Sequence, residues 1–274
     1  MKILIACDME GITGVTVWDH VDPSKLEYQR FRHLMTGDVN SAIEGAFEGG
    51  ADVVIVADGH WNGTNILIEE LDKRAQLNCG LGTAPFSMMQ GIDETFDGVI
   101  FIGYHARASS QYGVLDHTWS SKISNLWIND VLVGEYGLNA ALAGFFDVPV
   151  VMISGDQTVC AQARELIGNI ETAVVKQATG RFSAACLPPE ISQKLIRETA
   201  GKAVARLKIG DRPDPYSLST PVTVTIEFIS SEMADKAERI PGAHREGVRV
   251  SIPSSDMRAA YLAFRAAANL ASLE

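Results

Sequence analysis

Two carboxylates follow the first apolar run of the chain at a spacing suited to binding a metal ion. Residues 3–7 are apolar and of strand length, and Asp8 and Glu10 come directly after them, followed by Gly11. A short apolar run with such an end is typical of a buried parallel strand. Because successive side chains of an extended segment alternate between its two sides, Asp8 and Glu10 should project to the same side. We therefore expect two carboxylates in one small volume.

The same arrangement follows two later apolar runs. Residues 53–57 lead into Asp58 and His60, and residues 99–104 lead into His105. In an open parallel α/β sheet the carboxyl ends of the strands meet at one edge, where such folds bind ligands. Crowded carboxylates need a compensating cation, and carboxylates mixed with imidazoles suit a divalent transition metal, zinc first. The side chains expected to converge as a metal site are Asp8, Glu10, Asp58, His60 and His105.

Each of these residues also has a structural interpretation. A single acid at a strand end is usually a helix cap or a turn former, and a lone histidine is more often a hydrogen-bonded structural residue. The recurrence at three strand ends favours metal binding. For Asp58 three roles stay open: it could bind metal, orient His60 or cap the next helix.

Composition narrows the class of protein. The 274 residues are 46% hydrophobic and 21% charged, which is ordinary for a soluble globular protein. A formal net charge of -11 disfavours nucleic acid and anionic membranes as partners, since both require a positive surface. No apolar run reaches membrane-spanning length, and the first residues do not resemble a signal peptide. The four cysteines form no C-x-x-C pair, so we expect reduced, mostly buried thiols without a catalytic role in a cytoplasmic protein.

The elements that must position the site alternate between strand and helix. They predict an α/β fold with a doubly wound, mostly parallel sheet and helices on both faces over residues 1–182, the metal-binding catalytic domain. Pro188-Pro189 accompanies a change to a smaller α+β unit over residues 183–274. A glycine turn at residues 80–82 lacks the third glycine of a dinucleotide fingerprint. Helical stretches are expected at residues 22–35, 38–47, 62–71 and 86–91.

Residues 112–133 break this alternation with short β-prone pieces, which predict a hairpin-like excursion over the sheet edge. His117 lies at its beginning, beside Asp116. Glu135 follows in the first turn of a predicted helix, where the helix dipole favours a carboxylate. From the residues alone, His117 is a candidate to face a substrate, or a structural histidine held by Asp116. Glu135 has an ordinary structural explanation.

With these residues in view, the chain resembles the DppA-type D-aminopeptidases, bacterial zinc peptidases associated with dipeptide-transport operons, over nearly its whole length. The motifs that carry the resemblance are Asp8-Met9-Glu10-Gly11, Asp58-Gly59-His60, Pro85-Phe86-Ser87-Met88, Gly103-Tyr104-His105-Ala106-Arg107-Ala108, Ile128-Asn129-Asp130, Val133-Gly134-Glu135-Tyr136-Gly137-Leu138-Asn139-Ala140, Val175-Lys176-Gln177 and Arg181. Together they are far more specific than any one of them.

The resemblance implies two Zn²⁺ ions per subunit, a small-peptide substrate and a ring-shaped homo-oligomer, a decamer of stacked pentamers. It adds Glu135 as a ligand, moves Asp58 to a supporting position and gives His117 a catalytic role. The metal ligands it implies are Asp8, Glu10, His60, His105 and Glu135.

The expected activity is removal of the N-terminal residue, such as D-Ala, from short peptides by water activated between two metal ions, with Asp8 as the bridging ligand. His117 could serve as general base, general acid or nucleophile. Two rival functions remain on this scaffold: another metal-dependent amidase or phosphoesterase, since fold does not fix function, and a non-catalytic dipeptide-binding ring protein.

Overall fold

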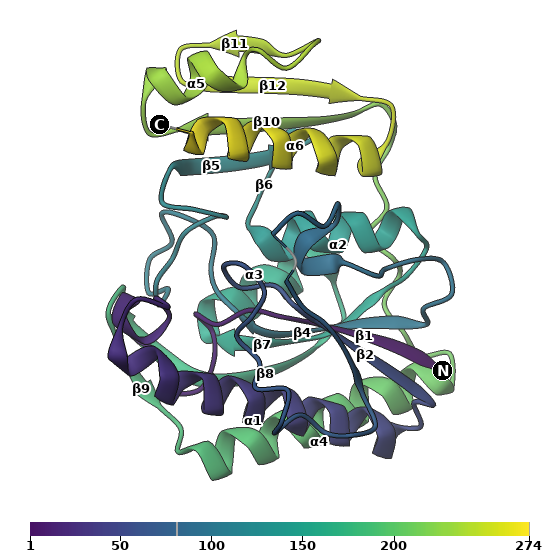
Figure 1. Ribbon diagram of the computed structural model, residues 1–274. Helices are drawn as coiled ribbons and strands as arrows, with labels where there is room; N and C mark the ends of the chain where they lie inside the picture. Colours follow the sequence, from purple (N-terminus) through teal and green to yellow (C-terminus); the bar gives the residue numbers. More distant parts are fainter. Residues whose placement is uncertain (81, 274) are drawn as a thin grey trace.

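Two sheets lie one above the other in the computed structural model, which describes residues 1–80 and 82–273 (Figure 1). The larger sheet has the order β3-β2-β1-β4-β7-β8-β9, and only β9 runs antiparallel to its neighbour. Its strands are β1 (Lys2–Cys7), β2 (Val53–Asp58), β3 (Gln76–Asn78), β4 (Gly98–Tyr104), β7 (Val150–Asp156), β8 (Glu171–Gly180) and β9 (Ser183–Cys186). The predicted fold class is confirmed. Leu81, in the glycine turn expected after β3, lies outside the described residues.

Helices cover both faces of the larger sheet, which explains why its central strands read as continuous apolar runs. On one face lie α1 (Leu26–Gly49) and α4 (Pro189–Lys208), and on the other lie α2 (Glu135–Phe145) and α3 (Gln157–Ile167) (Figure 1). Short 3₁₀ turns occur at Trp18–His20 and Ser87–Met89. Among the described residues, no helix is both long and apolar enough to cross a bilayer.

The smaller sheet is antiparallel and has the order β11-β12-β10-β5-β6. Its strands are β5 (Ile123–Ile128), β6 (Val131–Val133), β10 (Val222–Phe228), β11 (His244–Glu246) and β12 (Arg249–Ser254). The expected hairpin is β5-β6, turned by Asn129 and Asp130, whose φ angles of 46° and 65° suit a tight hairpin turn. Helices α5 (Ser231–Ala237) and α6 (Met257–Ser272) complete this unit.

Sheet membership crosses the expected boundary between residues 1–182 and 183–274. Strands β5 and β6 precede the boundary but belong to the smaller sheet, in which β5 pairs with β10 and β6 pairs with β5. Conversely, β9 and α4 follow the boundary but pack with the larger unit. If the two units are separate domains, β5 and β6 therefore belong to the second domain, and β9 and α4 belong to the first.

The prediction of two separate helices before β2 is wrong. The structure has a single helix, α1, where two stretches were expected. The Thr36 hydroxyl donates to the Arg32 carbonyl within the helix, and the Asp38 carboxylate accepts hydrogen bonds from Thr13. These polar residues, which read locally as a break, have their hydrogen bonds satisfied inside a continuous helix.

The helix expected over residues 62–71 is wrong, and the one over residues 86–91 is only the single 3₁₀ turn at Ser87–Met89. Backbone amides of Asn65 and Ile66 donate to the buried Asp58 carboxylate, so the chain after β2 folds as turns around that side chain. The Asp58 carboxylate thus accepts hydrogen bonds from amides that would donate to carbonyls of the segment itself if it were a helix.

Helices α1 and α4 pack closely at a glycine. A Cβ atom added to Gly45 of α1 would lie 2.1 Å from the carbonyl oxygen of Arg197 in α4. At Gly37, in the same helix, the added atom would meet only the end of the flexible Gln193 side chain. The two glycines therefore lie in the same helix but differ in what an added side chain would contact.

We expect Gly45→Ala to lower the free energy of unfolding by about 2 kcal/mol or more, because backbone cannot yield without separating the helices. Gly37→Ala should be neutral or stabilising by up to about 1 kcal/mol through helix propensity. Chemical denaturation of both variants measures this. Equal effects at the two positions would contradict close α1–α4 contact.

Candidate metal centre

Five buried acid and imidazole side chains meet at the carboxyl edge of the larger sheet. Strand β1 pairs with β2 on one side and with β4 on the other, so the residues that follow these three strands become neighbours. Glu135 joins them from the first turn of α2. None of the five is more than 6% exposed; they are Asp8, Glu10, His60, His105 and Glu135.

Asp8 lies between two histidines. Its Oδ1 is 3.3 Å from Nδ1 of His60, and its Oδ2 is 3.3 Å from Nε2 of His105. Each imidazole faces a second carboxylate: Glu10 Oε2 is 3.2 Å from His60 Nδ1, and Glu135 Oε1 is 3.0 Å from His105 Nε2. The donor atoms thus form two adjacent groups that share Asp8.

Each histidine of the site is fixed through its other ring nitrogen. His60 Nε2 donates to the Val21 carbonyl at 2.9 Å, and His105 Nδ1 donates to the Ala106 carbonyl at 3.0 Å. Because a carbonyl oxygen can only accept, a neutral ring carries its proton on that nitrogen and presents the other as a lone pair. Metal-binding histidines are oriented in this way.

Three buried atoms of the site have no hydrogen-bond partner in residues 1–80 and 82–273: Asp8 Oδ2, Glu10 Oε2 and His105 Nε2. A buried polar atom without a partner is costly, and here all three face the same volume. A set of carboxylate oxygens and imidazole nitrogens around such a volume fits zinc. The residues present are therefore suited to hold it.

Electrostatics leads to the same interpretation. Burial alone would lower the pKa of His60 and His105, but the facing carboxylates outweigh it and raise the pKa of both well above the ordinary value. Against the effect of burial, the two imidazoles hold the pKa of Asp8 well below its usual value. In the metal-free protein, protons on the histidines balance the carboxylates, and a divalent cation could take their place.

His117 lies at the open side of this cluster. Its ring stacks on that of His105, with centroids 4.0 Å apart, and its Nε2 is 3.8 Å from Glu135 Oε1 and 4.0 Å from Glu10 Oε1. Burial and the charge of His105 lower the pKa of His117. Its position allows either a role in proton transfer or a place beside Glu135 and His105 as a ligand.

The alternative in which Asp116 holds His117 does not match the hydrogen bonds. His117 Nδ1 donates to the carbonyl of Leu115 at 2.8 Å, while the Asp116 carboxylate accepts from the Ser110 amide and contacts Arg181. The unprotonated nitrogen of a neutral His117 ring is therefore Nε2, on the side of the carboxylates.

Asp58 has a supporting position. Both its oxygens accept hydrogen bonds from Asn65, and the Asn65 side-chain amide also donates to the His60 carbonyl at 2.6 Å. Asp58 thus orients the loop that carries His60. Two further histidines lie outside the cluster: His33 contacts Glu70 at the surface, and His20 stacks on Phe31.

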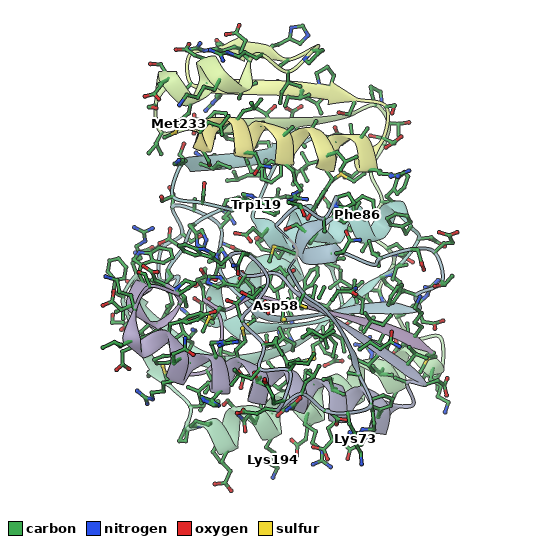
Figure 2. The ribbon with its side chains drawn as sticks, viewed as in Figure 1. Asp58, Lys73, Phe86, Trp119, Lys194 and Met233 are labelled. Carbon is green, nitrogen blue, oxygen red and sulfur yellow. The ribbon has the colours of Figure 1, made fainter. Side chains whose placement is uncertain are left out.

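A cavity of about 950 Å³ opens over the cluster, between the two units. The larger unit contributes Asp8, Glu10, His60 and Glu135 of the metal site, and α6 of the smaller unit contributes part of the opposite wall. Trp119 lies between the units (Figure 2). Wall residues that sequence reasoning did not assign to the site are Trp18, Trp61, Trp119, Arg181 and Arg265. They come from separate segments of the chain, which only the tertiary structure brings to one cavity.

The comparisons with known proteins agree with this arrangement. The sequence profile of the peptidase M55 family, described as D-aminopeptidase, matches residues 1–266. A D-aminopeptidase from Bacillus subtilis (strain 168) is 39% identical over 273 residues, covering 99% of this chain and 98% of the relative. The solved structure of Zn-dependent D-aminopeptidase DppA from Bacillus subtilis, described as a self-compartmentalizing protease, matches with a TM-score of 0.96 and 38% identity, covering 100% of this chain and 99% of the other.

We expect zinc to stabilise chelator-treated protein, raising the melting temperature by roughly 5–10 °C at a concentration about a hundred times the Kd. The rise should shrink as the pH falls, because bound ligands must be deprotonated. Differential scanning fluorimetry with and without zinc measures it. A variant with Asp8→Ala should show a much smaller rise, and an undiminished one would place the zinc elsewhere.

Proposed function

The chain belongs to the peptidase M55 family of D-aminopeptidases, and from this premise we propose that it is a zinc-dependent D-aminopeptidase acting on short peptides. The observation that carries the proposal is the position of Asp8, whose two oxygens face two histidines at 3.3 Å each. A carboxylate in that position can bridge two metal ions. A mononuclear catalytic zinc normally takes three protein ligands and would leave part of this donor set unused.

We assign the metal ligands as one group on each side of the bridge. Glu10 and His60 would bind the first ion with Asp8, and His105 and Glu135 would bind the second. The support is the shared burial of these side chains and the backbone hydrogen bonds that fix both imidazoles. Two zinc ions per chain follow from this division.

Bound zinc would lower the pKa of a water molecule and polarise the scissile carbonyl. His117 is the residue assigned to proton transfer, because it lines the cavity and its Nε2 lies 3.8 Å from Glu135 Oε1 and 4.0 Å from Glu10 Oε1. A neutral imidazole there can accept a proton from water and return it to the leaving amine. The free amino group of the substrate would be held by a metal ion or by a nearby carboxylate, which favours removal of the first residue.

We further propose that the protein assembles into a ring-shaped homo-oligomer, with a decamer of stacked pentamers as the expected state. The support is the similarity over the whole chain to a protein described as self-compartmentalizing. A cytoplasmic location remains part of the same proposal. Light scattering coupled to size-exclusion chromatography gives the copy number, and a monomer at micromolar concentration would contradict the ring.

Paired assays of D-alanyl and L-alanyl peptides, each with a free or acetylated amino end, test the activity. We expect zinc-loaded protein to hydrolyse the free D-alanyl peptide best. Equal turnover of acetylated peptides would exclude the aminopeptidase, and a preference for the L-peptide would exclude only the stereochemistry. Hydrolysis of phosphate esters without peptide hydrolysis would favour a different metal-dependent hydrolase.

Loss of the proposed bridge should affect both metal positions. We expect elemental analysis to find two zinc ions per chain and substantially less than one in a variant with Asp8→Ala. His60→Ala and His105→Ala should each lose metal as well as activity. A zinc content that never exceeds one at saturation would contradict the dinuclear site.

For His117→Ala we expect full zinc content, an unchanged melting temperature and a loss of at least about a hundredfold in kcat, the usual scale of general acid or base catalysis. Elemental analysis and steady-state kinetics separate the possible roles. Turnover close to that of the unaltered protein would refute the catalytic role, whereas loss of zinc would make His117 a ligand.

A further inference from the structure

Two arginines on the cavity wall are not used by the proposed chemistry. Arg181 and Arg265 both line the 950 Å³ cavity, although the chain carries a net charge of -11. Arg265 is only 9% exposed, and both its Nη atoms donate to backbone carbonyls, those of Ala84 and Gly82. Its guanidinium is thus occupied in joining α6 to the loop after β3. The arginine open to a ligand is Arg181, whose side chain is 46% exposed.

Arg181 is held in place by one neighbour. Its Nε lies 3.0 Å from Asp116 Oδ1, and its Nη2 donates to the Asp116 backbone carbonyl at 3.0 Å. Across residues 1–80 and 82–273, no protein acceptor is hydrogen-bonded to its Nη1. A guanidinium fixed on one edge retains donors for a second acceptor, and its planar fork suits a carboxylate.

Arg181 lies within the length of a short peptide from His117, at the open side of the metal centre. Its guanidinium carbon lies 5.9 Å from the centroid of the Trp18 ring, and that ring lies 5.3 Å from the imidazole of His117. Arg181 and His117 are therefore separated by no more than the sum of these distances. Two or three extended residues span such a gap at about 3.5 Å each.

We propose that Arg181 binds the C-terminal carboxylate of a di- or tripeptide whose amino end lies at the metal centre. This assignment rests on the proposed aminopeptidase function and deepens it by defining the class of substrate. The anionic cluster, neutralised by metal, would receive the amino end, and the fixed cation would receive the carboxylate. The cavity would then select peptides by their length as well as by their first residue.

The test compares D-alanyl peptides that differ only at the carboxyl end. We expect kcat/KM for D-Ala-D-Ala to exceed that for its C-terminal amide by about tenfold or more, mainly through KM, because the carboxylate contact is present in both the ground and the transition state. Arg181→Gln should bring this ratio close to one, and Arg181→Lys should restore part of it. For pentapeptides the free acid and the amide should react alike.

The ratio isolates carboxylate binding, since a disturbance of Asp116 or His117 would slow both peptides equally. Arg197→Gln is the matched control: Arg197 is also paired with a carboxylate and is 42% exposed, but it lies on α4, away from the cavity. It should leave the ratio unchanged. A ratio near one in the unaltered protein, or a full ratio in the Arg181→Gln variant, would overturn the assignment. Absence of all peptide hydrolysis would instead refute the proposed function.

Discussion

Three carboxylates buried in one volume repel one another, and the edge of the larger sheet is arranged around that repulsion. Asp8, Glu10 and Glu135 each contact an imidazole nitrogen, and each is at least nine-tenths buried. Such a group is stable only when a positive charge lies between its members. Protons on the histidines supply that charge in the metal-free protein, and divalent cations can supply more of it. The metal centre is in this sense a consequence of burying the acids.

The backbone is held tightly where Asp8 and Glu10 follow β1. A fully buried Lys176 of β8 donates from Nζ to three backbone carbonyls, those of Glu10, Ile12 and Val15, at 2.6, 2.9 and 2.7 Å. Its three donors are thereby all used. At Gly11 an added Cβ would lie 1.9 Å from the Tyr104 carbonyl oxygen, so only glycine fits. The loop that presents Glu10 is therefore fixed from both sides.

The cavity depends on both units of the fold. The larger sheet supplies the ligands, while α6 and the β5-β6 hairpin bring the smaller unit over them (Figure 1). Tyr261 of α6 donates to the backbone carbonyl of Phe86 at 3.0 Å, and its hydroxyl also lies 3.1 Å from Asn139 Oδ1 in α2. These buried contacts set the spacing of the two walls and so the size of the substrate that the cavity admits.

The sequence by itself determined the fold class and the strand ends at which Asp8, His60 and His105 emerge, because apolar runs and alternating side chains are local properties. Helix limits were less determined: an acceptor from β2, Asp58, turned an expected helix into a loop. Glu135 as a ligand came from family resemblance, since locally a carboxylate there is explained by the helix dipole.

Only the tertiary structure decided which imidazole nitrogen faces the acids and which arginine remains open to a substrate. The free nitrogen of His60 follows from a hydrogen bond to Val21, a carbonyl far away in the chain. Arg181 and Arg265 have the same chemistry, yet only Arg265 has both Nη atoms engaged by backbone carbonyls, those of the loop after β3. Such differences arise from contacts between segments distant in the chain. Those contacts depend on how helices and sheets pack, and no local pattern of residues records them.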